Sequence, residues 1–396
     1  MIIHQYSLFS FDEILKFQPE TQLMKILDEL DFSKLERALG KKPGSRGPKG
    51  YSISSLLAAL VSAQLAKDTR INKLTERLRA DPVLRWTCGF GVLGDVPSES
   101  VFCRLYEKLA ATKSLMRLFR ELVLKAKERG VIEGTRAAID SSELEAYEKA
   151  RPSSKLPDDC IHPHWGVKKG TDGVRHYWYG WKVHAVCDCK SELPMEILVT
   201  PANTHDSGVA IPLLRIMDSN YGGAIDPKHV MMDSGYDAEY IYDEIAKVQK
   251  RTPVIALNER SKNGPPEGMN EKYEPVCSMG YPLTYYGRDG DFLKFRCPHM
   301  TGRCDCPMGT AWCSPSNYGY TLKLPWKEDL RRLGYPHRAS AAWQTLYNMR
   351  TSVERMFSRL KEKLNMNNIR VAGLGKARVH VLLNCITLIA GTLAVN

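Results

Sequence analysis

The stretch from residue 347 to 363, YNMRTSVERMFSRLKEK, combines a helical repeat with polar residues in an unusual place. At about 100° per residue, one stripe about 60° wide holds four polar side chains, those of Tyr347, Arg350, Glu354 and Lys361. This stripe borders the apolar residues, whereas solvated side chains ordinarily lie opposite them. One interpretation is an exposed helix with an Arg350–Glu354 ion pair, which stabilises a helix by only a few tenths of a kcal/mol. The other is that the stripe lines a cleft against a neighbouring layer.

Two aspartates offer that stripe something to face. Asp140 ends the apolar run TRAAID (135–140) and Asp233 ends KHVMMD (228–233), and both runs are predicted strands. Carboxylates at strand ends of one α/β layer can meet, and Glu354 from a helix packed on that sheet completes a trio. Such a trio supplies the hard oxygen ligands that two Mg²⁺ ions need for phosphoryl transfer. Taken singly, each aspartate also fits a turn or a helix cap, as in DSGY (233–236).

The remaining pattern predicts the order of the elements. Residues 50–130 have helical periodicity, and after them the period changes repeatedly. The predicted elements are paired strands in 177–189 and 193–201, a helix over 206–218 capped by Asp206, a helix over 237–250, a strand over 252–257 and a helix over 341–364. This order predicts an α/β layer with helices against a mixed sheet.

The charge balance indicates the class of partner. The formal net charge is +11, and the segment from Arg338 to Arg378 alone holds nine Lys or Arg against two acids. A basic excess of this kind favours a polyanion, most simply nucleic acid. The first residues lack a basic region typical of secretory signals, which predicts a cytoplasmic protein. The apolar run 379–395 contains polar residues and predicts a buried terminal helix, not a membrane span.

Residues 259–339 have no sustained period and are rich in Gly, Pro, Tyr and Cys, which predicts an irregular, partly β insertion. Five of the eleven cysteines lie within 37 residues here, with His299 nearby: Cys277, Cys297, Cys304, Cys306 and Cys313. An odd number of cysteines in a long chain argues against a disulfide framework. The spacing is not the paired CxxC pattern of many zinc sites. Two interpretations therefore stay open: reduced cysteines that pack, or a structural Zn²⁺ held by Cys297, Cys304, Cys306 and Cys313.

The spacing Tyr347-x2-Arg350-x3-Glu354-x6-Lys361 resembles the signature of the DDE transposases of the insertion-sequence-4 type. The segments YGWKVHAVCD (179–188), TPANTHDS (200–207) and VMMDSGYDA (230–238) resemble the strand and turn motifs of that group. Residues 82–105 are similar to the helical N-terminal domain of many members. The resemblance covers roughly residues 50–260 and 340–390.

This resemblance implies an RNase H-like, integrase-type core with a helical N-terminal domain and a β-rich, cysteine-containing insertion. It implies a catalytic triad of Asp140, Asp233 and Glu354 that binds two Mg²⁺ or Mn²⁺ ions. It also implies that Tyr347, Arg350 and Lys361 contact double-stranded DNA near the cleaved end. The expected activity is to cut the terminal inverted repeats of a bacterial insertion sequence and to join the 3′-hydroxyl to target DNA. The expected assembly is a homodimer on DNA, associated with the nucleoid and not with a membrane.

The expected organisation divides the chain into five parts. These are an N-terminal segment with a basic linker (1–49), a helical domain that binds DNA ends (50–130), the first part of the core (131–258), the insertion (259–339), and the catalytic and C-terminal helices (340–396). Two alternatives stay open. One is an RNase H-like nuclease without strand transfer. The other is an inactive, transposase-derived DNA-binding protein, against which the three intact carboxylates argue.

Overall fold

The computed structural model describes residues 10–11, 13, 19–41, 44, 46–47, 50–152, 160–170, 173–258, 265–309 and 312–395. Its N-terminal part is helical: α2 (Gln22–Asp28), α3 (Ser33–Leu39), α4 (Ile53–Leu65), α5 (Ile71–Ala80), α6 (Pro82–Thr87), α7 (Glu99–Ala110) and α8 (Ser114–Glu128). Helix α4 is buried along nearly its whole length, which explains its apolar composition. The Ser52 side chain caps α4 and the Asp81 carboxylate caps α6, satisfying backbone N–H groups of each first turn.

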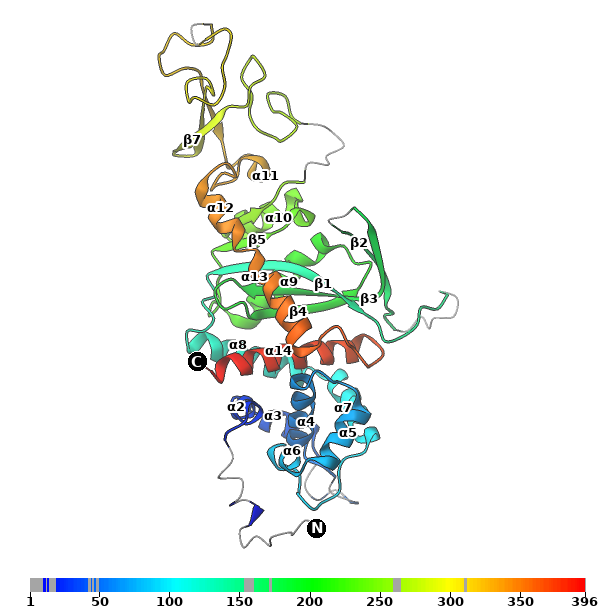
Figure 1. The fold of residues 1–396 in the computed structure, drawn as a ribbon. Helices are drawn as coiled ribbons and strands as arrows, with labels where there is room; N and C mark the ends of the chain where they lie inside the picture. The colour runs from blue at the N-terminus through cyan, green and yellow to red at the C-terminus, as the bar shows by residue number, and fades with distance from the viewer. Residues whose placement is uncertain are drawn as a thin grey trace, which may run out of the picture.

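A mixed six-stranded sheet forms the centre of the molecule (Figure 1). Its strands are β1 (Arg136–Glu145), β2 (His164–Lys169), β3 (Arg175–Asp188), β4 (Pro194–Pro201), β5 (His229–Met232) and β6 (Thr252–Ile255). The order is β2-β3-β1-β5-β6, with β4 also pairing β3. Strands β1, β3 and β4 pair antiparallel, whereas β1, β5 and β6 run parallel. The predicted mixed sheet with paired strands 177–189 and 193–201 is therefore confirmed.

Helices cover this sheet. Helix α9 (Asp206–Tyr221) contacts β1, β3 and β4, and α13 (Thr351–Ser358) contacts β1 and β3. After β5 come the short 3₁₀ helix η2 (Ser234–Tyr236) and helix α10 (Glu239–Asp243), and α10 continues directly into the π-helix η3 (Glu244–Val248). The prediction that Asp206 caps α9 was wrong, since His205 occupies the cap position. The Asp206 carboxylate instead accepts a hydrogen bond from Lys182 Nζ at 3.1 Å.

The helix predicted over 341–364 is interrupted. It consists of α12 (Ala341–Asn348), α13 and the π-helix η4 (Arg359–Lys363), with a tight turn at Met349 and Arg350. In that turn the N–H groups of Met349 and Arg350 bond to carbonyls only three residues earlier. Because 3₁₀ and π turns depart from 3.6 residues per turn, a single 100° wheel does not hold across the whole stretch.

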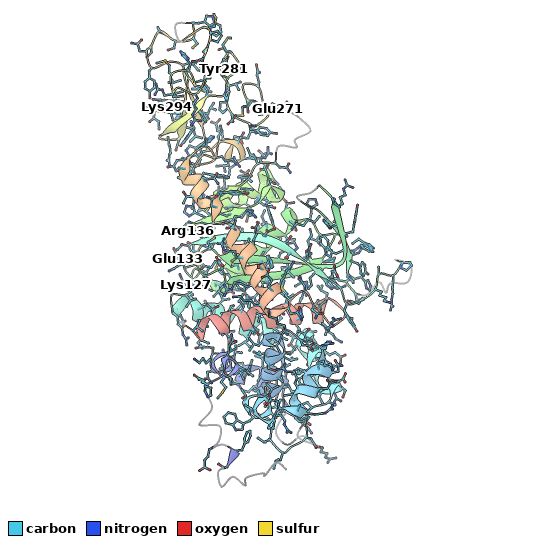
Figure 2. The ribbon with its side chains drawn as sticks, viewed as in Figure 1. Lys127, Glu133, Arg136, Glu271, Tyr281 and Lys294 are labelled. Carbon is cyan, nitrogen blue, oxygen red and sulfur yellow. The ribbon has the colours of Figure 1, made fainter. Side chains whose placement is uncertain are left out.

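The insertion forms its own small sheet, seen at the top of Figure 1. Its antiparallel strands are β7 (Thr284–Asp289), β8 (Phe292–Arg296) and β9 (Thr321–Pro325), followed by α11 (Leu330–Leu333). Figure 2 shows Tyr281 and Lys294 in this part, well separated from Arg136 at the start of β1. A separate core of four buried residues, Leu283, Leu293, Phe295 and Leu333, supports it.

Helix α14 (Leu374–Leu393) joins the sheet to the N-terminal helices (Figure 1). It packs on β4 from one side and on α2, α4, α7 and α8 from the other. By length and composition alone α14 is apolar enough to cross a membrane, but 78% of its most apolar window is buried inside the protein. The predicted buried terminal helix is therefore confirmed.

Candidate active site

Asp140 and Asp233 occupy equivalent places on adjacent parallel strands. The last pair between β1 and β5 joins Ala138 to Met231, and each aspartate lies two residues beyond it. Asp140 was predicted to end its strand, but β1 continues to Glu145 along β3. The two aspartates therefore mark the end of the β1–β5 pairing, where two neighbouring strands bring their carboxylates together.

The environment of Asp140 shows that the two carboxylates interact. Burial is the main cause that raises the Asp140 pKa from 3.8 to about 7, and the Asp233 charge raises it further. The Ser141 N–H, which donates to Asp140 Oδ1 at 2.7 Å, and the Arg350 charge oppose this rise only in part. Two carboxylates in a partly desolvated place repel one another, and a bound cation would remove that repulsion.

Asp233 is held by its own turn. It caps η2, and its Oδ1 accepts the Gly235 N–H at 2.9 Å. The DSGY turn predicted from the sequence is therefore present. It holds the Asp233 carboxylate beside Asp140, so the turn and the interaction with Asp140 occur together. Asp233 Oδ2 is not occupied by this turn bond.

Glu354 faces Arg350. Arg350 Nη1 lies 2.9 Å from Glu354 Oε1 and 3.9 Å from Asp140 Oδ2, so the guanidinium links the helix carboxylate to the sheet carboxylate. The Glu354 side chain is 50% exposed. Across the described part of the chain, no three His, Cys, Asp or Glu side chains are placed to hold a metal ion. The structure thus brings Asp140 and Asp233 together. Glu354 instead contacts the Arg350 guanidinium, which in turn approaches Asp140.

The other residues of the polar stripe also lie toward the sheet. Tyr347 stacks on Trp343, with ring centroids 4.7 Å apart, and Arg350 lies over the Tyr347 ring at 5.7 Å. Lys361 Nζ is 3.7 Å from Glu143 Oε1 on β1. The Arg350–Glu354 ion pair of the exposed-helix interpretation does form, but contacts of the same stripe with β1 show that it borders a site.

Two buried polar atoms near the aspartates lack partners among the described residues. The Arg350 Nε donor is one, and the Tyr236 hydroxyl is the other. Burial, and the charges of Asp140, Asp206 and Asp233, hold the Tyr236 pKa well above its usual range. Buried polar groups are nearly always hydrogen-bonded, so these orphaned donors indicate a place that receives a further polar group.

Lys168 is a site residue that sequence analysis missed. The segment 164–169 was not predicted as a strand, yet β2 pairs with the first half of β3 to form a two-stranded ribbon. The Lys168 charge lowers the pKa of Asp140 and, after burial, that of Lys361, which places its ammonium near both. The signal available in the sequence was the basic, aromatic pattern HWGVKK followed by VRHYWYGW.

The cysteines of the predicted zinc site lie elsewhere. Cys297, Cys304, Cys306 and Cys313 are all in the insertion, where they line a separate small cavity. They take no part in the arrangement around Asp140.

Comparisons with known proteins agree with this geometry. The family model described as Transposase DDE domain matches residues 133–390, and that described as Transposase domain (DUF772) matches residues 12–108. A comparison with curated proteins gave no match. Among solved structures, the chain is similar to one titled a piggyBac transposase synaptic complex with hairpin DNA. That chain is 12% identical with a TM-score of 0.45, over 94% of this chain and 74% of the other. Because the DDE-domain model spans well over half of the sequence and includes both aspartates and the polar helix, the chain belongs to the transposases with a DDE domain.

Proposed function

We propose that Asp140, Asp233 and Glu354 are the catalytic triad of this transposase. The observation that carries the proposal is the equivalent placement of Asp140 and Asp233 on adjacent parallel strands, where the charge of one raises the pKa of the other. The Tyr347, Arg350, Glu354 and Lys361 spacing supports assignment to the insertion-sequence-4 type and to a bacterial mobile element. The reaction is hydrolysis at the element ends, followed by attack of the freed 3′-hydroxyl on target DNA.

Divalent metal ions are generally used by transposases with a DDE domain, and the residues around Asp140 fit such an ion. The Asp140 carboxyl, whose pKa is raised, and the neighbouring Asp233 carboxylate are hard oxygen donors that gain from a nearby cation. The buried Tyr236 hydroxyl has no hydrogen-bond partner among the described residues and could donate to a further polar group there. We assign Mg²⁺ or Mn²⁺ to Asp140 and Asp233, with Glu354 completing a two-metal site. When bound, these ions activate the attacking oxygen and stabilise the leaving oxygen.

Arg350 is proposed to couple DNA binding to completion of the triad. Its guanidinium pairs with Glu354 and approaches Asp140. A DNA phosphate is a strong bidentate acceptor for arginine, and the buried Nε is available for it. As Arg350 turns to the phosphate, the Glu354 carboxylate is released toward the aspartates.

The DNA path is proposed to run past the β2–β3 ribbon. Two-stranded ribbons fit the major groove of duplex DNA, and this ribbon combines basic residues with exposed aromatic ones. Trp165 is 58% and Tyr177 61% exposed. The Lys168 charge acts on Asp140, and Lys361 Nζ lies 3.7 Å from Glu143 on the same strand, so we assign both to phosphates beside the cleaved bond, with Tyr347 and Arg350.

The helical part, residues 50–130, is proposed to bind the terminal inverted repeats, with the core from 131 performing the chemistry. Reaction at two element ends implies a homodimer on DNA. The protein is placed in the bacterial cytoplasm, with no role at a membrane. The main alternative, a nuclease that hydrolyses without strand transfer, shares the same site and differs only in its products.

The test uses linear DNA that carries the inverted repeats flanking the gene, a target plasmid and Mg²⁺. The wild-type chain is expected to give both cleaved ends and joined products. Asp140→Ala, Asp233→Ala and Glu354→Ala are each expected to abolish both, while Glu362→Ala, an exposed glutamate on η4, retains them. Cleavage without joined products would favour the nuclease, and full activity of Asp233→Ala would refute the triad.

A further inference from the structure

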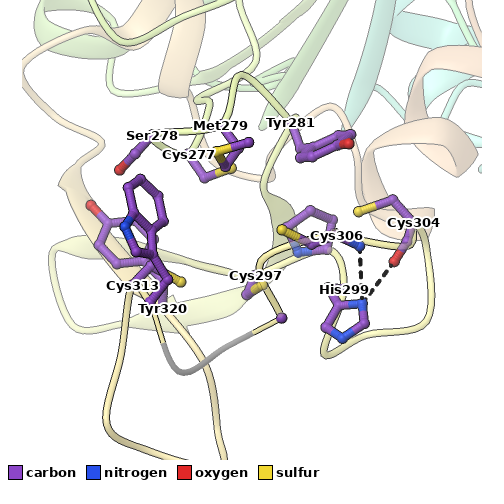
Figure 3. A pocket seen from close by; sticks show the side chains of 13 residues that line it. Cys277, Ser278, Met279, Tyr281, Cys297, His299, Cys304, Cys306, Cys313 and Tyr320 are labelled. Carbon is purple, nitrogen blue, oxygen red and sulfur yellow. Dashed lines mark hydrogen bonds between the residues drawn. The ribbon is translucent and has the colours of Figure 1, made fainter.

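Five cysteines and one histidine line a single small cavity in the insertion (Figure 3). The side chains are those of Cys277, Cys297, Cys304, Cys306, Cys313 and His299. The cavity has a volume of about 20 Å³, close to that of one water-sized sphere. A space of this size, walled by thiols from segments up to 36 residues apart in the chain, suits a single ion better than an organic ligand.

Two of the thiols are presented by the same local structure. The segments Cys277-Ser-Met-Gly280 and Cys306-Pro-Met-Gly309 share the pattern C-x-M-G. In each, the glycine N–H donates to the cysteine carbonyl three residues earlier, at 2.8 Å for Gly280 and 3.0 Å for Gly309. Both glycines have positive φ, +77° and +57°, a conformation that glycine adopts without strain. The chain therefore builds one cysteine-bearing turn twice and directs both turns to one cavity.

His299 orders the loop between these turns. Its Nδ1 lies 3.2 Å from the Cys304 carbonyl oxygen and 3.3 Å from the Cys306 backbone nitrogen, as the dashed lines in Figure 3 mark. This contact fixes the backbone that carries both thiols. It gives the histidine a supporting role without requiring it as a ligand.

The described part of the insertion has a small apolar core. Its core consists of four buried residues, and neither helix nor strand occurs among the described residues of 297–320. None of the eleven cysteines, all of which the structure describes, forms a disulfide. Small units with so little core ordinarily need a metal or another cross-link.

We propose that this cavity is a structural Zn²⁺ site formed by the thiolates of Cys277, Cys297 and Cys306, with Cys304 or Cys313 as the fourth. Zinc in structural sites takes four such ligands in a tetrahedron. On binding, each coordinating S–H releases its proton to solvent and the sulfur forms the bond to zinc, without oxidation or reduction.

Zinc binding requires the thiols to move. As the side chains stand, no three His, Cys, Asp or Glu in the described ranges are close enough to share an ion, so rotation about the Cα–Cβ bonds must draw the sulfurs inward.

The site lies outside the catalytic arrangement and is independent of the proposed reaction. The sequence interpretation placed the ion on Cys297, Cys304, Cys306 and Cys313. The structure adds Cys277, which reaches the same cavity from before β7. The insertion then continues through β9 and α11, whose Arg331 pairs with Asp237 shortly after Asp233. A zinc ion in this cavity therefore stabilises the insertion, which contacts the segment that follows Asp233.

The test measures the metal content of the purified chain by inductively coupled plasma mass spectrometry. We expect about one zinc per chain, and a thiolate-to-cobalt charge-transfer band after replacement by Co²⁺. Cys277→Ser and Cys306→Ser are expected to lose the zinc. Cys103→Ser, an exposed cysteine on α7, should retain it.

A second measurement covers variants that fail to fold. Titration of the wild-type chain with a mercurial reagent should release zinc to a coloured indicator as the thiols are blocked. The double variant Cys304→Ser/Cys313→Ser should also lose the ion. A wild-type chain that takes up no zinc, or a Cys277→Ser or double variant that retains all of it, would overturn the site, whatever the outcome of the DNA assays.

Discussion

Arg350 and Glu354 form an ion pair of 2.9 Å across one turn of helix. The same guanidinium nitrogen reaches Asp140 Oδ2 at 3.9 Å. One cation of the protein thus contacts two of the three carboxylates that we propose to act together. A metal ion at Asp140 and a DNA phosphate at Arg350 would both compete with these contacts.

Replacing Arg350 separates its two effects. Arg350→Ala removes a charge-assisted contact to phosphate worth about 1.5–3 kcal/mol, so cleavage at saturating Mg²⁺ should fall by roughly 10- to 100-fold. The freed Glu354 should at the same time leave the Mg²⁺ concentration for half-maximal activity unchanged or lower. Arg350→Lys, which lacks the bidentate fork, should recover only part of the rate. A higher Mg²⁺ requirement in Arg350→Ala would contradict this coupling.

Asp140 should make the metal-free protein less stable at neutral pH. Its pKa is raised from 3.8 to about 7 by burial and by Asp233, so the folded state holds this proton more tightly than the unfolded one. The contribution of Asp140 to the free energy of unfolding therefore falls as pH rises from about 4 to about 7, and it stays low above that range. In EDTA at pH 8, Asp140→Asn should be more stable than wild type by about 2–4 kcal/mol.

Urea unfolding at pH 5 and pH 8 checks this expectation. The gain in Asp140→Asn should shrink at pH 5, where the wild-type carboxyl is largely protonated. Mg²⁺ should stabilise wild type at pH 8 more than it stabilises the variant. Asp243→Asn, an exposed aspartate on α10, serves as control, and an equal gain there would remove the explanation.

The Asp237–Arg331 pair should be a main link between the insertion and the segment that follows β5. Arg331 donates twice to the fully buried Asp237, at 3.0 and 2.6 Å, and Asp237 also accepts from the Tyr242 hydroxyl and the Asn258 N–H. Removing one partner leaves an uncompensated buried charge, so Arg331→Ala should cost about 3–5 kcal/mol in the free energy of unfolding. The exposed pair of Lys247 and Asp243 offers a matched control, since Lys247→Ala should cost under about 0.5 kcal/mol.

Lys168 should contribute one phosphate contact. Lys168→Ala should weaken binding to all DNA sequences alike and lower the slope of log K against log salt by about 1. Lys228 is the control, because this exposed lysine precedes β5 at the end of the strand away from Asp233 and pairs with Asp226. If both variants show the same salt slope as wild type, the ribbon is not on the DNA path.

Local periodicity predicted the elements whose pattern is self-contained. Strands β3 and β4 and the helical stretch 50–130 follow from alternation or from a 3.6-residue repeat, and Asp233 was placed correctly because β5 ends there. Asp140 was wrongly predicted to end its strand, because nothing in the local sequence reveals that β1 continues along β3 beyond its pairing with β5.

The features that sequence analysis missed depend on contacts between distant segments. The tight turn at Met349 and Arg350 and the π-helix η4 interrupt the helical repeat, and no local pattern marks them. Among the described residues strand β2 pairs with β3 alone, so its register cannot be read from either segment by itself. Cys277 lies 20 residues before the next cysteine of its cavity, and only the small sheet between them brings the two together.

Helix α14 has a consequence for the order in which the molecule is assembled. It covers apolar faces of α4, α7 and α8 as well as β4, yet the ribosome makes it long after all of them. Before α14 is synthesised, the apolar side chains that it covers on those helices and on the sheet are exposed. A helix that is synthesised after all the parts it contacts is therefore the one that joins those parts into a single body.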